Sequence, residues 1–334
     1  MFTSLSWKDE IENTRYTLDS NAFETRMQVD EYIAALKQNI LPLKLANVGR
    51  AAYNHDLLIR SQEYALTSTE TALLKATLAT AVLTKFNSSG LNVIDVGSGN
   101  GMKAAAVLEI LHQKFSRLKY VGLDYSKELL QMAVRYISTQ LGELNATTFQ
   151  IDFEKGAFHE IVEQVHRETG FPSLLLFLGH TLGNPVDRQQ ALTNIAASLV
   201  PEDILLVGVE LYQPHKVSSI LDHYRNESFY QAIFESLSFA GFQRRDGTLE
   251  VRFNDTTKDV ETYFRLNKDI TVQVGPSESI QFKAGNKILI FLSHKFNEIE
   301  LREMCSLAGL NIFEAALNED QTYLLAFTYR DTWK

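Results

Sequence analysis

Residues 93–103 read VIDVGSGNGMK, and this stretch decides the fold class that we expect for the chain. An apolar run ends in Asp95, three glycines follow in a G-x-G-x-G spacing, and a helical pattern begins at Met102. Strand, glycine turn and helix in this order form a nucleotide-binding crossover, in which the helix N-terminus offers unpaired N–H groups to a ligand. Because Met102 stands where a dinucleotide fingerprint needs glycine, the spacing disfavours NAD.

Acidic residues also close the next two expected strands. The run 120–123 ends in Asp124, and the run 149–151 is followed by Asp152 and Phe153. A carboxylate at the second strand end is placed to accept hydrogen bonds from both ribose hydroxyls of a nucleoside. Acids at three successive strand ends therefore indicate S-adenosylmethionine (SAM), which carries hydroxyls, an amine and a cationic sulfur but no phosphate. The alternative for the glycine loop taken alone is an ordinary tight turn.

The composition excludes several other classes of protein. The chain has 334 residues, of which 45% are hydrophobic and 22% charged, as in a soluble globular protein. A net charge of −9 without a basic stripe argues against a nucleic-acid partner. We find neither a signal-peptide pattern at the N-terminus nor an apolar run of about 18 residues, so we expect a cytoplasmic enzyme without a membrane partner. Cys305 is the only cysteine; we expect it to be buried, and we expect no metal site.

The pattern from residue 93 to about 210 alternates between strands and helices. Expected strands lie near 93–97, 119–123, 147–151, 173–179 and 203–210, and expected helices near 101–114, 126–141, 158–168 and 186–199. The strands are nearly continuous apolar runs, as in a parallel sheet that is covered on both faces. This predicts an α/β fold with a doubly wound, Rossmann-like sheet.

The pattern changes after Glu210. A helical pair at about 216–240 and three short alternating strands predict a small α+β domain inserted into the doubly wound sheet. The predicted divisions are an N-terminal helical or lid segment (1–60), a ligand-binding core (61–211), an inserted substrate-binding or lid domain (212–286) and a return to the core (287–334). The last part holds a helix at 297–308 and two strands joined by a hairpin, so we expect an antiparallel final strand.

Several segments together resemble one family. Residues 177–184, FLGHTLGN, are similar to the FLG-x-T-[IL]-GN signature of the histidine Nα-methyltransferases of ergothioneine biosynthesis, a family that includes fungal enzymes methylating tryptophan derivatives. Other matching segments are the glycine loop with Lys103, 123–126, Asp152 with Phe153, Glu63 with Tyr64, 249–252 and 293–296. The resemblance runs from about residue 50 to the C-terminus. It implies a class I methyltransferase sheet that binds SAM and releases S-adenosylhomocysteine.

The resemblance also implies roles for individual residues. Those that would surround SAM are Gly97, Ser98, Gly99, Lys103, Asp124, Tyr125, Asp152 and Phe153. Those that would form the substrate pocket are Gly179, Thr181, Asn184, Tyr224, Val251, Phe291 and Ser293. Asn184 and Tyr224 would bind the substrate carboxylate, while Tyr53 and Tyr64 would orient the amine and receive its proton through water. The plain alternatives are a turn residue for Asn184 and a core or surface residue for Tyr224.

Two departures from the family bear on the substrate. Phe291 stands where histidine enzymes carry the glutamate that bonds the imidazole, and Val251 stands where they carry methionine. Unpaired imidazole nitrogens would cost about 1–3 kcal/mol each, so such a site discriminates against histidine. Phe291 offers a stacking face and Val251 leaves room, so we expect N-methylation of a free aromatic amino acid, tryptophan or a derivative. The alternative is that Phe291 only repacks a lid, or that the alignment is shifted along this strand.

Other functions stay open at this point. Arginine, histidine or another amino acid is a possible substrate, since acids such as Glu261 and Glu278 could serve a cationic side chain. A nicotinamide dehydrogenase and a non-catalytic SAM-binding homologue are the rival classes. Met102 argues against the first, and the intact pair of Asp124 and Asp152 argues against the second. We expect a monomer.

Overall fold

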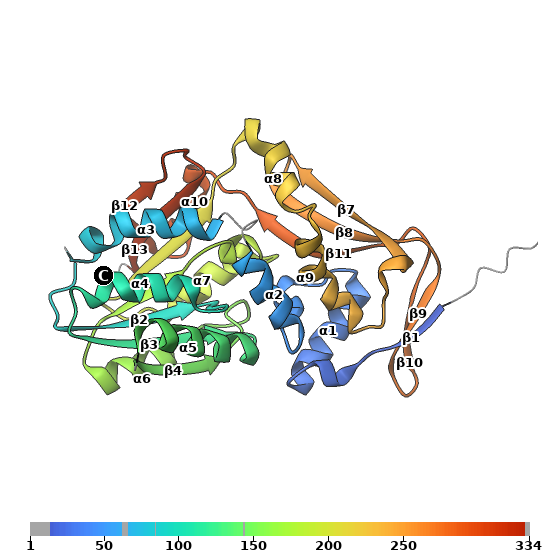
Figure 1. Ribbon diagram of the computed structural model, residues 1–334, viewed down its shortest axis with the longest axis horizontal. Coiled ribbons are helices and arrows are strands. Elements are labelled where there is room, and N and C mark those ends of the chain that lie inside the picture. The colour runs from blue at the N-terminus through green and yellow to red at the C-terminus, as the bar shows by residue number, and fades with distance from the viewer. Residues whose placement is uncertain (1–13, 62–65, 84, 143, 331–334) are drawn as a thin grey trace, which may run out of the picture.

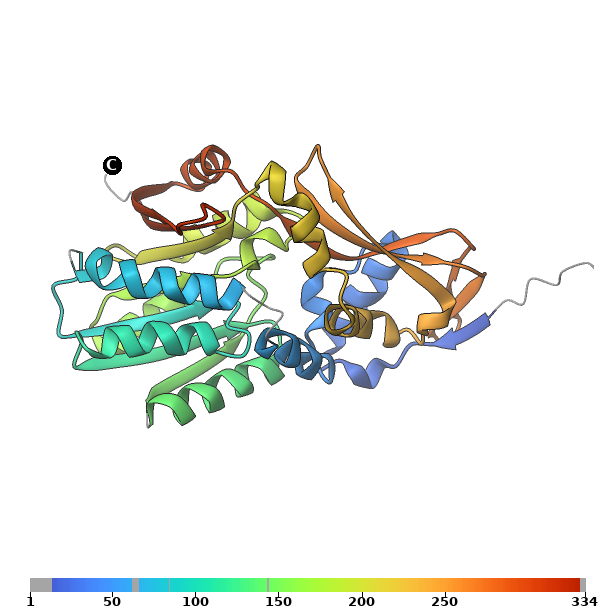
Figure 2. The same ribbon diagram turned by 45° about the horizontal axis from the view of Figure 1, so that its top comes forward.

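The computed structural model describes residues 14–61, 66–83, 85–142 and 144–330. Within these residues, a wide open sheet with helices on both faces forms one part of the molecule, and smaller sheets with several helices form the other (Figures 1 and 2). The N-terminal helices α1 (Arg26–Gln38) and α2 (Ala51–Arg60) lie with the second part.

Seven strands form the wide sheet, in the order β12-β13-β6-β5-β2-β3-β4. They are β2 (Gly90–Val96), β3 (Arg117–Asp124), β4 (Asn145–Gln150), β5 (Ser173–Phe177), β6 (Ile204–Glu210), β12 (Leu310–Leu317) and β13 (Tyr323–Arg330). Strand β13 is antiparallel to both of its neighbours, and the pairs from β6 to β4 are parallel. The order reverses at β2, so ligands are expected at the carboxyl ends of β2 and its neighbours. The predicted doubly wound sheet with an antiparallel final strand is confirmed.

Helices cover both faces of this sheet because its strands are apolar on both sides. One face packs against α3 (Leu66–Leu83), α4 (Met102–His112) and α5 (Lys127–Leu141). The other face packs against α6 (His159–Thr169), α7 (Arg188–Ser198) and α10 (Glu298–Leu307). Ser126 caps α5 by accepting a hydrogen bond from the backbone N–H of Leu129, and Cys305 on α10 is fully buried, as expected.

The second part is built around two three-stranded sheets. One contains β7 (Gly247–Asn254), β8 (Asp259–Leu266) and β11 (Lys287–His294), and the other β1 (Thr14–Thr17), β9 (Ile270–Gly275) and β10 (Glu278–Phe282). Its helices also include α8 (Val217–His223) and α9 (Glu227–Ser238). Short 3-10 turns in the described residues of the whole molecule are η1 (Ser20–Ala22), η2 (Leu43–Ala46), η3 (Thr181–Gly183), η4 (Pro214–Lys216) and η5 (Arg244–Asp246). A single apolar cluster joins α1, α9 and both sheets.

Two segments lie elsewhere than the sequence predicted. Strand β11, expected to return to the core, pairs with β8, and the chain rejoins the wide sheet only where Phe296 bridges Leu211. The N-terminal segment is not separate, because β1 pairs with β9 and α1 shares the apolar cluster of the inserted strands. Strands β1 and β10 have four and five residues, too few for a periodic signal, and their partners are distant in sequence. No helix in the described parts of the chain is long and apolar enough to cross a membrane.

Candidate active site

The glycine loop connects β2 to α4 at the carboxyl edge of the wide sheet. Gly97, Gly99 and Gly101 have φ angles of +69°, +53° and +79°, which residues with a Cβ rarely adopt. A Cβ on Gly97 would approach Cγ2 of Thr181 to 2.7 Å, whereas a Cβ on Gly99 would have nothing within 4 Å. The backbone is therefore packed tightly at Gly97 and open to a ligand at Gly99.

Asp124 ties the end of β3 to this loop. Asp124 is 8% exposed, and its carboxylate accepts hydrogen bonds from the backbone N–H groups of Gly99 and Ser126, both at 2.9 Å. Burial raises the pKa of Asp124 to about 6, although these backbone donors oppose the shift. A carboxylate has about four acceptor positions, and the backbone N–H groups of Gly99, Ser126 and Tyr125 use three of them, so Asp124 keeps capacity for a further donor such as a ribose hydroxyl.

Asp152, after β4, is held by the N-terminal segment. Lys44 of η2 donates to Oδ2 of Asp152 at 2.7 Å, pairs with Glu31 at 2.9 Å and lies 5.3 Å from the ring centroid of Tyr125. Phe153, next along the chain, packs its ring edge-on against Phe177 at the end of β5, with the centroids 5.4 Å apart. The N-terminal segment therefore covers the strand ends where the sequence placed the cofactor.

Lys103 of α4 lies over the loop that carries the FLGHTLGN segment (177–184), here called the signature loop. Its Nζ is 3.2 Å from Oε2 of Glu70, a fully buried carboxylate on α3. Glu70 also accepts from the backbone N–H of Gly179, at 2.8 Å, and from the hydroxyl of Tyr323. Gly179 has a φ of +79°, which residues with a Cβ rarely adopt, and a Cβ there would also displace Nζ of Lys103, so glycine is favoured at this position.

A cavity of about 60 Å³, here called the smaller cavity, brings together three of the predicted substrate residues. They are Asn184, which follows η3, Tyr224, which ends α8, and Phe291 of β11. Oδ1 of Asn184 is buried without a hydrogen-bond partner among the described residues. An unpaired buried polar atom costs about 1–3 kcal/mol, so this amide is a strong candidate to bind a ligand.

Aromatic rings form one wall of the smaller cavity. Phe291 is 5% exposed, and its ring centroid lies 4.8 Å from that of Phe229 and 5.3 Å from that of Tyr224. The rings of Phe291 and Phe229 are nearly perpendicular, at 89°. Edge-to-face contacts of this kind fix the orientation of a ring, so Phe291 presents a defined apolar surface.

A buried lysine organises the polar side of the pocket. Lys295 is fully buried, and its Nζ donates to Oε2 of Glu210 at 2.6 Å, to the hydroxyl of Tyr224 at 2.8 Å and to Oγ of Ser293 at 3.0 Å. His180 contacts the same oxygen of Glu210 through Nε2, at 2.6 Å. Burial favours a higher pKa for Glu210, yet Lys295 and His180 hold that pKa well below its usual range. Glu210 is therefore an ionised carboxylate.

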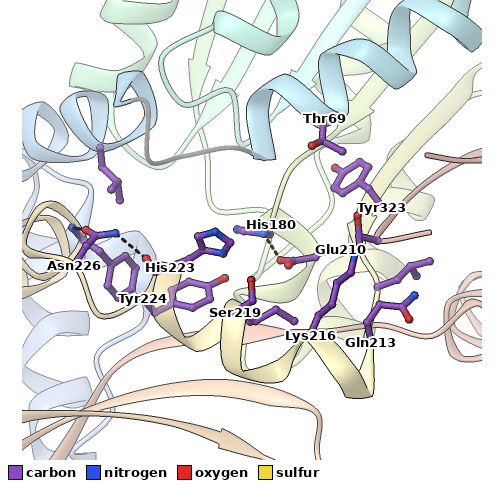
Figure 3. Close-up of a pocket in the computed structure, with 15 residues that line it drawn as sticks. Thr69, His180, Glu210, Gln213, Lys216, Ser219, His223, Tyr224, Asn226 and Tyr323 are labelled. Atoms are coloured by element: carbon purple, nitrogen blue, oxygen red, sulfur yellow. Dashed lines mark hydrogen bonds and ion pairs between the residues drawn. The ribbon is translucent and has the colours of Figure 1, made fainter. Parts of the chain in front are cut away.

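A larger cavity of about 230 Å³ adjoins the first. His180, Glu210 and Tyr224 line it, with Lys216 and His223 on the α8 side (Figure 3). The two cavities share Leu58, His180, Tyr224 and Phe229 as lining residues. Their combined volume is close to the lower end of the roughly 300–1,000 Å³ found for small-molecule sites.

His294, at the end of β11, anchors the loop that carries Asn184. Its Nδ1 lies 2.9 Å from Asp259 and its Nε2 2.9 Å from Glu300, and Arg188 also pairs with Asp259. A Cβ on Gly183 would approach the backbone oxygen of His294 to 3.0 Å, so the signature loop packs directly on this strand. The inserted sheet thereby sets the position of the loop at the pocket.

Comparison with known proteins identifies the family. Residues 46–329 match the model of the histidine-specific, SAM-dependent methyltransferases. The chain belongs to this family. It is 27% identical to the histidine N-alpha-methyltransferase of Mycobacterium tuberculosis, over 77% of this chain and 79% of that protein. It is 25% identical to the N-methyltransferase imqF of Aspergillus flavus (80% and 74%) and 22% identical to the L-tryptophan methyltransferase trpM of Psilocybe serbica (70% and 71%).

Family membership confirms the resemblance drawn from the motifs. The protein is a SAM-dependent N-methyltransferase, and SAM is its cofactor. The carboxyl edge of the sheet suits this cofactor, because the loop is open at Gly99 and the buried carboxylate of Asp124 keeps a lone pair for a ribose hydroxyl. The dehydrogenase alternative is thereby excluded.

Some of the predicted residues lie away from the pocket of this methyltransferase. Tyr53, on α2, is 59% exposed, and Tyr64 falls outside the described residues. Val251 lines a separate surface hollow beside Tyr230, and in the sheet Thr262 separates it from Phe291. That places Val251 two strand spacings, about 9–10 Å, from Phe291.

Ser293 lies behind the pocket wall, where it accepts from Lys295, and Thr181 packs against Gly97. The residues that the sequence interpretation missed are His180, Glu210, Lys295, Lys44 and Glu31. His180 and Lys295 lie within two of the segments that resemble the family, 177–184 and 293–296. Their polar side chains could therefore have been considered as pocket residues from the sequence. Lys44 and Glu31 had no local signal, because their partners lie more than a hundred residues away or on another element.

Proposed function

We propose that this methyltransferase transfers a methyl group from SAM to the amine of a free amino acid with an aromatic side chain, tryptophan or a derivative, in preference to histidine. The observation that carries the proposal is the meeting of Asn184, Tyr224 and Phe291 in one cavity. Two polar groups suited to an amino-acid backbone thus lie beside an aromatic wall.

The polar side of the cavity supports an amino-acid substrate. Asn184 supplies an amide whose buried end needs a partner, and either end can face the ligand because the amide can flip. Tyr224 accepts a hydrogen bond from Lys295 at 2.8 Å, and its own hydroxyl donates to Oγ of Ser293 over a long 3.4 Å, so that hydrogen can turn to a stronger acceptor such as a carboxylate. These contacts are the basis for assigning the substrate carboxylate to Asn184 and Tyr224.

The apolar side supports an aromatic side chain over imidazole. The described residues that line the smaller cavity include Leu43, Leu58, Ile59, Phe229, Ala232, Ile233 and Phe291, and no carboxylate. Glu210, in the larger cavity, already pairs with Lys295 and His180. An imidazole would find no ionised partner in the smaller cavity, whereas a flat aromatic ring gains about 0.5–1.5 kcal/mol from an edge-to-face or offset contact.

The cofactor contacts are part of the same proposal. Asp124 would accept from the ribose, Asp152 and Phe153 would border the adenine, and Lys103 would face the amino-acid end of SAM. SAM supplies an electrophilic methyl group, so the protein has mainly to hold an unprotonated amine in line with it and to exclude water. Two contacts would help to exclude water. Lys44 pairs with Asp152, and α2 lies over the glycine loop, where Asn100 donates a hydrogen bond to Asp56 at 2.8 Å.

A cationic substrate has less support. Glu261 pairs with Arg252 at 2.7 Å, and Glu278 pairs with Lys37 at 2.6 Å. Both acids that could have served an arginine side chain are thus bound to basic residues of the chain itself. A monomeric state and a cytoplasmic location stay predictions from the sequence.

Incubation with SAM and a panel of free amino acids tests the function. Mass spectrometry would detect additions of one, two or three methylene increments, and we expect tryptophan or a related aromatic amino acid to react fastest. Tryptamine, which keeps the ring and lacks the carboxylate, is the matched control and should react poorly. Faster turnover of histidine than of tryptophan would contradict the side-chain argument, and methylation of tryptamine as fast as of tryptophan would contradict the role of Asn184 and Tyr224.

A further inference from the structure

We propose that Lys44 holds the two parts of the molecule together over the ligands and thereby makes SAM and the amino acid bind cooperatively. This inference deepens the proposed function and depends on it, because it requires SAM beside Asp152 and an amino acid in the smaller cavity. Lys44 acts through Asp152 and η2 and not on the reacting atoms, so it is a positioning residue.

The two parts of the molecule have separate apolar cores. The cluster of the second part includes Leu36, Leu41 and Leu45 of the N-terminal segment. The clusters on the two faces of the wide sheet contain none of the described residues before Leu73. Among the described residues of the wide-sheet part, only the partly buried ring of Tyr125 packs against the cluster of the second part. Parts of a chain that share no large apolar interface are expected to move relative to each other.

Charged contacts join the two parts at the N-terminal segment, and Lys44 is at their centre. Its Nζ lies 2.7 Å from Oδ2 of Asp152 and 3.5 Å from Oε2 of Glu154, both after β4, and 2.9 Å from Oε1 of Glu31 on α1. Burial lowers the pKa of Lys44, but Glu154 and Asp152 raise it overall, so the ammonium stays charged.

A second lysine at this junction is less shielded. Lys155 also pairs with Glu31, at 2.6 Å, but its side chain is 51% exposed, whereas that of Lys44 is 11% exposed. Exposed ion pairs contribute little, because water screens them and their long side chains must be immobilised. Lys44 is therefore the main charged link between the two parts at this edge of the sheet.

The 3-10 turn that carries Lys44 borders both ligand sites. Turn η2 begins at Leu43, which lines the smaller cavity together with Asn47. The next residue, Lys44, holds Asp152, the residue that the proposed function assigns to the adenine of SAM. Adjacent residues of one turn therefore face the amino acid and the cofactor site, and a shift of η2 changes both sites at once.

Both parts of the molecule also contribute walls to the smaller cavity. Asn184 belongs to the wide-sheet part, whereas Tyr224 and Phe291 belong to the second part, so the cavity is complete only when the parts are closed on each other. Two of the chain crossings between the parts lie side by side where Leu211 bridges Phe296. Figure 1 shows α8 and β11 above this junction and α1 and α2 below it. Crossings on one side of a ligand site and a charged contact on the other are the arrangement of a hinge.

A closed state that two ligands share makes their binding cooperative. Closing the parts on each other costs conformational freedom, and once the first ligand has offset that cost, the second binds to a protein that is already closed. By thermodynamic linkage, SAM strengthens amino-acid binding by the same factor by which the amino acid strengthens SAM binding. Lys44 sets this factor, because it joins Asp152 to the turn that borders the amino acid.

Titration calorimetry on Lys44→Met tests the proposal. The ligands are S-adenosylhomocysteine and the amino acid that the wild type methylates fastest, tryptophan by the proposed function, each titrated with and without the other. In the wild type we expect each ligand to lower the dissociation constant of the other by at least about 5-fold. In Lys44→Met this coupling factor should fall below about 2-fold. A merely structural role would weaken each ligand by the same factor whether or not the other is bound, and would leave the coupling factor unchanged.

Lys37→Met is the matched control. Lys37 is another lysine of the N-terminal segment and pairs with Glu278 at 2.6 Å, but both residues belong to the second part. We expect this variant to keep the wild-type coupling factor. Circular dichroism checks folding, and Lys44→Gln is measured instead if Lys44→Met does not fold.

The inference is overturned if the wild type shows no coupling, if Lys44→Met keeps the wild-type factor, or if Lys37→Met loses it equally. Its failure is distinct from that of the proposed function. If the wild type methylates tryptophan without coupling, the proposed function stands and the inference is wrong. If it methylates only amines other than amino acids, the proposed substrate is wrong, and the coupling is measured with that amine. If it methylates no amine, both are wrong.

Discussion

Replacing Asn184 by alanine should change stability and substrate binding in opposite directions. Oδ1 of Asn184 is buried without a described partner, so its removal relieves a cost of at most about 1–3 kcal/mol in the free protein. At about 2 °C per kcal/mol for a protein of this size, the melting temperature without ligand should rise by up to about 2–6 °C. Because the side chain already borders a cavity, its truncation opens no new closed void.

The same truncation removes a hydrogen bond to a charged group of the substrate. Such a bond contributes about 1.5–3 kcal/mol, and about 1.4 kcal/mol corresponds to a factor of ten. The dissociation constant of the amino acid should therefore rise by about 10- to 150-fold, while that of SAM should not change. Scanning calorimetry of the free protein and titration calorimetry with S-adenosylhomocysteine present would measure both effects.

Asn194→Ala is the control for stability. Asn194 is also a buried asparagine, but its amide donates to the backbone oxygens of Phe153 at 2.9 Å and Glu154 at 3.1 Å. Its replacement leaves two carbonyls short of a donor, so the melting temperature should fall. If Asn184→Ala lowers the melting temperature in the same way and leaves amino-acid affinity unchanged, the amide is structural and the reasoning fails.

Three further predictions concern the cofactor, the substrate and pH. Asp124→Ala should abolish measurable SAM binding in calorimetry, since each lost ribose hydrogen bond is worth about 1.5–3 kcal/mol; full retention would place the ribose elsewhere. Phe291→Glu should weaken tryptophan and improve histidine in a competition assay, and the reverse ranking would refute the wall assignment. Burial favours a lower pKa for His294, but Asp259 and Glu300 raise it overall. The charged form of His294 therefore stabilises the fold fully below the ordinary histidine pKa of about 6.5, and this stabilisation is lost as the pH rises through the higher pKa of the folded protein. His294→Gln should flatten the plot of melting temperature against pH in this range, and an unchanged slope would contradict this.

The parts of the fold that could be predicted are those encoded locally. The glycine loop at Gly97 and the acids Asp124 and Asp152 follow apolar strands directly, and parallel strands bring their carboxyl ends to one edge. The alternation of strand and helix therefore predicts the layers of the fold, and the hairpin near residue 318 predicts the antiparallel strand at the end of the sheet.

The parts that could not be predicted depend on pairings between distant segments. Nothing near β11 indicates that its partner is β8 and not the core, since both environments bury an apolar strand. Val251 was placed in the pocket by motif position, yet its strand is separated from that of Phe291 by β8. The network around Lys295 was missed for a similar reason, because a buried lysine is recognisable only when Glu210 and Tyr224 are seen beside it.

The pairing of β1 with β9 has a consequence for how the chain is made. Tyr16, on β1, donates to Asp246 at 2.9 Å, across 230 positions of sequence. At about 5–20 residues per second, a ribosome needs on the order of 10–50 s to deliver that partner after β1 has emerged. The wide sheet from β2 to β6 can assemble during this interval, while the apolar faces of α1 and the N-terminal strand are still exposed. Translation that stalls before β9 has emerged therefore leaves β1 and the apolar face of α1 without the strands that bury them in the folded protein.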